Sequence, residues 1–101
     1  MAYIGKVKIS NSWEKLEDLI KAQISGQSSF SFSTSKSYSL QADGANNVQV
    51  RVCDTSVAPA SETAGEHLDG AQFAVYEPTS GNALYVKQNG FPAFLSVSEL
   101  A

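Results

Sequence analysis

Residues 37–52 read SYSLQADGANNVQVRV, and the rest of the chain is organised around this stretch. Alternate positions in both of its halves are apolar: Tyr38, Leu40, Ala42, Val48, Val50 and Val52. Successive side chains of a strand point to opposite faces, so this period of two predicts two strands, each with one apolar face. Residues 43–47 lie between them and include Asp, Gly and two Asn, which favour turns. The pattern predicts a central β-hairpin on whose apolar face the other elements pack.

A single helix is predicted over residues 11–24. Asn11 or Ser12 is suited to cap its N-terminus, and Glu14 stands three residues after Asn11, as in a capping box. Gly26 is placed to end the helix in the left-handed conformation. Apolar residues that predict one buried face recur at helical spacing: Trp13, Leu16, Leu19 or Ile20, and Ile24.

The residues before this helix alternate weakly. Val7 and Ile9 fall on one side, and Lys6 and Lys8 on the other. Lysines are typical of an exposed sheet edge. Residues 1–10 are therefore predicted to form an N-terminal arm or an edge strand, which docks on a neighbouring subunit.

Serine occupies every odd position from residue 29 to residue 39. The even positions in this segment hold Phe30, Phe32, Thr34, Lys36 and Tyr38. The alternation predicts a strand at residues 30–32, a break near residues 34–36, and then the first hairpin strand. Its outward row of small hydroxyl groups is either a solvated face or a surface that another subunit can approach closely.

The second half of the chain contains a long aperiodic segment and then three short apolar runs. Residues 54–70 are predicted to form a loop of about 17 residues, a length typical of functional or disordered loops. Phe73 and Val75, residues 84–86 and residues 94–97 are separated by turn signals at 80–82 and 88–90, which predicts a three-stranded meander.

Together these elements predict a single domain, residues 1–101, that is mainly β. The expected architecture is a compact antiparallel sandwich or small barrel of six to seven strands, with one short amphipathic helix closing an open end. A double meander without a second sheet is the competing architecture. The residues expected in the core are Trp13, Leu16, Ile20, Phe32, Tyr38, Leu40, Val48, Val50, Phe73, Val75, Leu84, Val86, Phe94 or Leu95, and Val97.

Composition narrows the classes of partner. The net charge is −3 and the pI is near 4.9, which argues against direct binding of nucleic acid. Residues 1–36 carry five Lys against three acids, whereas residues 37–101 carry two cations against seven acids. Either these are ordinary solvated faces, or opposite faces attract copies of the chain head to tail. No signal peptide and no membrane span is predicted, so synthesis is expected in the cytoplasm.

The residues suggest no catalytic or metal chemistry. Cys53 is the only cysteine, so no internal disulfide forms, and a structural thiol is the expected role. His67 is the only histidine and lies among acids, but it has no second His or Cys at ligand spacing. The acids do not follow the spacing of a calcium loop. We therefore predict no enzyme, no cofactor and no metal site.

The order of motifs over residues 37–97 resembles small accessory virion proteins of tailed bacteriophages, namely head decoration, head-fibre or tail-associated β-domains. The motifs that carry the resemblance are Tyr38-x-Leu40-Gln41, Val48-x-Val50-x-Val52, Pro59, Gly65-x-x-Leu68 and Leu84-Tyr85-Val86 before a final strand. The resemblance implies a structural protein without catalytic residues, which binds a symmetric shell or tube, often as a trimer, and stabilises or decorates it. The expected partners are the major capsid or tail protein and copies of the chain itself, and the expected location is the virion.

A receptor- or carbohydrate-binding β-module is the alternative function, and a small hydrolase is a more distant one. The residues predicted to contact a partner are Tyr3, Ile4, Val57, Pro59, His67, Phe91 and Pro92. Phe91 follows a turn signal at Asn89-Gly90, so its ring either inserts into a partner or folds back over its own sheet.

Overall fold

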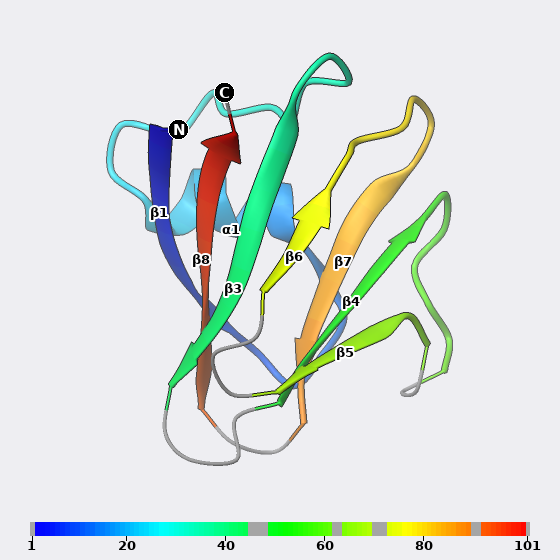
Figure 1. Ribbon diagram of the computed structural model, residues 1–101. Coiled ribbons are helices and arrows are strands. Elements are labelled where there is room, and N and C mark those ends of the chain that lie inside the picture. The colour runs from blue at the N-terminus through cyan, green and yellow to red at the C-terminus, as the bar shows by residue number, and fades with distance from the viewer. Residues whose placement is uncertain (1, 45–48, 62–63, 70–72, 90–91, 101) are drawn as a thin grey trace.

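The computed structural model describes every residue except 1, 45–48, 62–63, 70–72, 90–91 and 101. Within this part of the chain there are eight strands and one helix (Figure 1): β1 (Ala2–Ile9), β2 (Glu14–Lys15), α1 (Leu16–Gln23), β3 (Ser37–Gly44), β4 (Gln49–Thr55), β5 (Glu66–Asp69), β6 (Phe73–Tyr76), β7 (Ala83–Gln88) and β8 (Ala93–Leu100). They form two antiparallel sheets, sheet A in the order β1-β8-β3-β6 and sheet B in the order β2-β7-β4-β5. The mainly β prediction is confirmed, but the count of six to seven strands is wrong, and the sheets do not close into a barrel.

The predicted central hairpin is wrong. β3 pairs with β8 and β6 in sheet A, whereas β4 pairs with β7 and β5 in sheet B. The predicted inward residues are nevertheless buried in both strands: Tyr38, Leu40, Ala42, Val50 and Val52. Val48 lies outside the described residues. The alternation correctly predicted that each strand has one buried face. The two strands face each other across the core from different sheets, however, and do not pair side by side.

The predicted C-terminal meander is also wrong, because β6 and β8 belong to sheet A and β7 to sheet B. The expected inward face of β6 is inverted: Phe73 is 67% exposed and Val75 is 55% exposed. Tyr76 is buried in their place, and Ala74 packs against the core. All four residues of this strand are apolar or aromatic, so alternation alone does not select a face.

The helix is shorter than predicted. Its first residue is Leu16, because Glu14 and Lys15 pair with β7 as the short strand β2. The residues that α1 buries are Leu16, Leu19 and Ile20. The helix packs against β1 and β7, so it closes the side of the sandwich where these strands of the two sheets lie (Figure 1). Gly26 adopts the expected positive φ of 84° beyond its end.

Trp13 precedes the helix and is only half-buried, contrary to its predicted place on the helical core face. Its indole Nε1 donates a hydrogen bond to the carbonyl oxygen of Ser61 at 3.0 Å. The predicted edge strand is present as β1, which pairs with β8 of its own chain and buries Val7 and Ile9.

The strand predicted at residues 30–32 is absent from the structure, where residues 27–36 form turns and irregular backbone. Phe32 instead packs its ring edge-to-face with Phe30, Tyr38 and Tyr76, at centroid distances of 4.9, 4.8 and 5.1 Å. Ser33 donates its backbone N–H to the Tyr38 hydroxyl at 2.9 Å. Aromatic packing, and no sheet pairing, holds this segment over the end of the sandwich.

The long loop predicted over residues 54–70 is interrupted by secondary structure. β4 extends to Thr55, and β5 returns beside it with His67 opposite Arg51, so the connection covers residues 56–65. Gly65 enters β5 with φ +74°, and a Cβ at that position would overlap the backbone carbonyl of Val52.

The core lies between the two sheets. The predicted core residues that are buried are Leu16, Ile20, Tyr38, Leu40, Val50, Leu84, Val86, Leu95 and Val97. Leu95 is the inward member of its pair, since Phe94 is 36% exposed. Phe32 is half-buried and packs against the core.

Candidate functional site

Sheet A presents an outer face of small polar residues bordered by aromatic ones. Its strand register aligns the outward residues in two rows. One row contains Lys6, Ser96, Gln41 and Phe73, and the next contains Tyr3, Ser98, Ser39 and Val75. Serine is short, so the middle of the face, over β3 and β8, lies lower than the β6 side. Of the serine row predicted over residues 29–39, only Ser37 and Ser39 lie on β3, and Ser96 and Ser98 of β8 supply the other hydroxyl groups.

A hollow of about 450 Å³ lies in this face and is lined by Ser39, Gln41, Phe73, Val75, Ser98 and Leu100. Its volume falls in the range of roughly 300–1,000 Å³ that is usual for ligand sites. None of the six lining residues is charged. Hydroxyl and amide groups therefore lie directly beside a large exposed aromatic ring.

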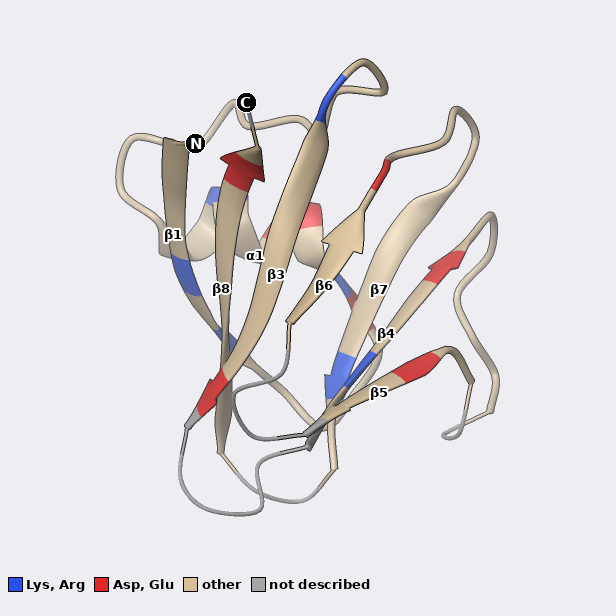
Figure 2. Cartoon of the chain, viewed as in Figure 1, with Lys and Arg blue, Asp and Glu red and all other residues tan. Residues whose placement is uncertain are grey.

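Two of the lysines near this face pair with carboxylates. Lys6 Nζ lies 2.6 Å from Asp43 Oδ2, and Lys36 Nζ lies 3.0 Å from Glu99 Oε1. The hydrogen bond and the opposite charge of each carboxylate raise the pKa of the lysine above its ordinary value. β6 and the middle of β3 and β8 carry no charged residue, as Figure 2 shows. A partner that meets this region meets a neutral surface.

A second hollow, the edge groove, opens between the two sheets beside β6. Its volume is about 440 Å³. Apolar and aromatic residues of both sheets line it: Leu40, Val52, Ala74, Val75, Tyr76 and Leu84. Three carboxylate residues also line it, namely Asp54, Glu66 and Glu77. The groove thus combines apolar side chains with carboxylates, and its charge is acidic.

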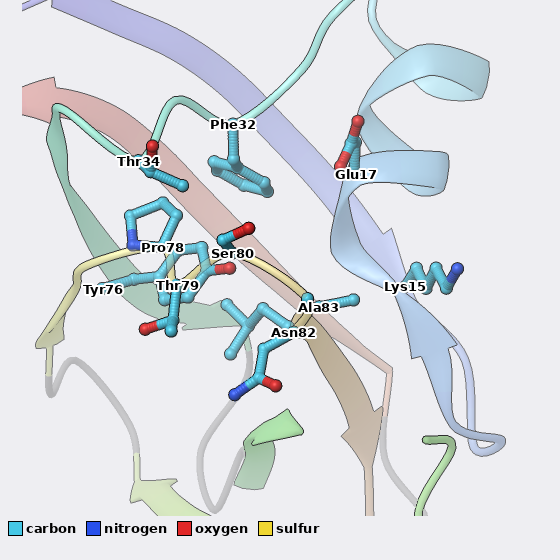
Figure 3. A pocket seen from close by; sticks show the side chains of 12 residues that line it. Lys15, Glu17, Phe32, Thr34, Tyr76, Pro78, Thr79, Ser80, Asn82 and Ala83 are labelled. Carbon is cyan, nitrogen blue, oxygen red and sulfur yellow. The ribbon is translucent and has the colours of Figure 1, made fainter. Parts of the chain in front are cut away.

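The third hollow lies between α1, residues 32–34 and the loop from β6 to β7 (Figure 3). It has a volume of about 150 Å³, below the usual size of a ligand site. Figure 3 shows Tyr76, Pro78 and Thr79 gathered on one side of it and Glu17 of the helix on the other. Burial, with the nearby carboxylates of Asp54 and Glu17, raises the pKa of Tyr76 to about 12. The phenol therefore stays neutral to a higher pH than an ordinary tyrosine does.

Three carboxylate residues and Cys53 line the edge groove, but no described histidine lines any of the three hollows. Cys53 is half-buried on β4 at the edge groove, and His67 is exposed on β5. Among the described residues, no group of three or more His, Cys, Asp or Glu side chains lies close enough to hold a metal ion. The eight-residue helix α1, the one helix described, is too short to cross a membrane.

The predicted partner residues lie on separate parts of the molecule. Tyr3 is 65% exposed and stands opposite Ser98, and Ile4 is half-buried beside it. Val57, 70% exposed, and the half-buried Pro59 belong to the connection between β4 and β5. His67 lies on sheet B, Pro92 is exposed before β8, and Phe91 lies outside the described residues.

Sequence reasoning missed Phe73 and Val75 as surface residues. They are two of the large apolar side chains that are more than half exposed, and they are adjacent on one strand face. The signal available in the sequence was the run FAVY, in which either face could be inward. Only the aromatic packing of Tyr76 against Phe32 shows which residues turn outward.

Comparison of the chain with models of protein families, with curated protein sequences and with solved structures yields no match in any of the three.

Proposed function

We propose that this chain is a non-enzymatic accessory protein of a bacteriophage virion, which docks on the capsid or tail through the outer face of sheet A. The observation that carries the proposal is the pair Phe73 and Val75, large apolar residues that are 67% and 55% exposed on a strand without charges. A monomeric protein gains nothing by exposing two adjacent apolar side chains, whereas an interface uses them. The virion is proposed as the location because the motif order over residues 37–97 resembles that of accessory virion proteins.

The proposed assembly contains several copies of the chain, with a trimer as the expected form. The product is made in the host cytoplasm and then becomes part of the virion. Neutral, low-relief surfaces suit close contact between subunits because no charge must be desolvated.

Cosedimentation with phage particles tests this function. The double variant Phe73→Ser with Val75→Ser is expected to fold normally and to lose particle binding. Val57→Ser is the matched control, because Val57 is 70% exposed but lies on the connection between β4 and β5. Light scattering of the free protein gives its mass, near 10.8 kDa for a monomer. Binding by the double variant equal to that of the unchanged chain would remove the proposed docking face.

A carbohydrate-binding role is the second candidate, and the uncharged hollow in sheet A favours it. Sugar sites combine an aromatic platform with hydroxyl and amide groups, and Phe73 lies there beside Ser39 and Gln41. NMR titration with neutral oligosaccharides is expected to shift the amide signals of these residues if this role is correct. Unchanged spectra at millimolar sugar would exclude it.

A further inference from the structure

The four sheet edges of the sandwich differ in how they are protected. An edge strand exposes unpaired N–H and C=O groups and can pair with another chain unless something blocks it. The β1 edge is blocked by α1: the Gln23 side-chain amide accepts from the backbone N–H of Lys8 at 2.7 Å and donates to its carbonyl at 3.0 Å. The Ile24 side chain packs against the face of β1 at Gly5, where a Cβ would meet it.

The edges of sheet B are protected in other ways. β2 has two residues and continues directly into the helix. β5 carries the exposed residues Glu66 and His67. β6, in contrast, has a regular register with β3, no charged residue and two exposed apolar side chains. β6 is four residues long, like β5, but among the described edge strands it is the one protected neither by a charged side chain nor by the helix.

The edge groove lies beside this unprotected strand. A strand added to β6 would turn alternate side chains inward, because side chains alternate between the faces of a sheet. The inward ones would enter the groove of about 440 Å³, against Leu40, Val52 and Leu84. The outward ones would lie beside Phe73 and Val75. Backbone pairing and side-chain pockets are thus available together, as strand addition requires.

The charge of the groove restricts what can occupy it. Asp54, Glu66 and Glu77 line it, and no Lys, Arg or His does. A segment with Lys or Arg at its flanks would complement these carboxylates, and an acidic segment would be repelled.

We propose that β6 binds an extended segment of a partner protein by strand addition, and that this segment carries apolar residues at alternate positions and Lys or Arg at its flanks. This inference rests on the proposed function, since it describes how the virion partner is held. A second copy of the chain is a poorer occupant. Its own segment of suitable pattern, Lys6 to Ile9, already pairs with β8, and Val7 and Ile9 are 0% and 1% exposed there.

The probe is the capped peptide acetyl-Lys-Val-Thr-Val-Thr-Val-Lys-amide, titrated into the isotope-labelled protein and followed by NMR. We expect the NMR signals of the backbone amides of β6 and Asp54 to shift. The β6 N–H groups that face away from β3 should exchange more slowly with solvent. The same peptide with Pro at its central position cannot complete the pairing and is expected to bind about tenfold more weakly or worse. A peptide with Glu in place of both Lys tests the charge requirement.

Two protein variants complete the test. Val75→Lys places a charge at an exposed position of the open edge. It should weaken binding of the lysine peptide by about tenfold or more. Glu77→Lys should weaken binding of the lysine peptide and strengthen binding of the glutamate peptide. Absence of shifts on β6, or equal binding of the Pro peptide, would overturn strand addition. If the chain binds phage particles but not the peptide, only the proposal of strand addition is wrong. If the chain binds the peptide but not phage particles, the virion role is wrong and the strand-binding site on β6 stands.

Discussion

Replacing Phe32 and Phe73 by Ala, one at a time, compares the same substitution in two opposite environments. Phe32 makes three edge-to-face ring contacts at 4.8 to 5.1 Å and packs against the core. Phe→Ala in a core costs about 3–5 kcal/mol, and each aromatic pair adds about 0.5–1.5 kcal/mol beyond burial. Because Phe32 is only half-buried, we expect a loss near the lower end, about 3 kcal/mol of unfolding free energy.

Phe73 is 67% exposed, so only about a third of its side chain is removed from water. Full burial of a Phe is worth about 1.5–3 kcal/mol, which leaves about 0.5–1 kcal/mol for Phe73→Ala. The two variants should therefore differ by about 2 kcal/mol, or roughly 8–16 °C in melting temperature for a domain of this size.

Thermal and urea unfolding, followed by circular dichroism, measure both variants. Phe32→Leu serves as a control that keeps most of the buried volume and should lose less stability than Phe32→Ala. Equal destabilisation by the Phe32 and Phe73 substitutions would mean that Phe73 supports the core, and it would refute the assignment of β6 as a strand with an apolar outward face.

Three further outcomes are expected. The pKa of Tyr76 is raised to about 12, so the unfolded chain loses this proton first as pH rises above 10. The free energy of unfolding, measured in urea, should therefore fall between pH 10 and pH 12, and the Tyr76→Phe variant should show a smaller fall. Gly65→Ala should lower the free energy of unfolding by about 2 kcal/mol or more, because a Cβ there would overlap the backbone. Gly81 has a similar positive φ of 88° but open space around it, so Gly81→Ala should cost about 1 kcal/mol. Equal losses in urea unfolding would contradict the steric argument. Gln23→Ala should cost about 1 kcal/mol and accelerate hydrogen exchange at the Lys8 amide, and unchanged exchange would show that Gln23 does not cover the edge.

Local pattern was sufficient to predict which elements exist where one face is polar and the other apolar. β1, β3 and β4 alternate between the two classes, and each buries the residues that alternation selects, such as Ile9, Leu40 and Val50. The same reasoning failed for β6, where both faces are apolar and the packing of Tyr76 against Phe32 decides the orientation. The helix start was misplaced because pairing of Glu14 with Val86, a residue far away in the chain, competes with helical propensity.

The candidate site could not be found from sequence for a related reason. The polar half of the face was visible as a row of serines, but its aromatic border comes from β6, and the residues that line the hollow lie in three strands that are distant in the chain.

The sequence by itself determined the fold class, the single helix and most of the inward residues, because each depends on the period of apolar side chains along a short segment. Only the tertiary structure decided which strands share a sheet. Alternation states that a strand has one buried face, but it is equally satisfied by a partner beside the strand and by a partner across the core. In this chain every connection except that from β4 to β5 leads to the opposite sheet, and that arrangement leaves β6 as an open edge with Phe73 and Val75 outside.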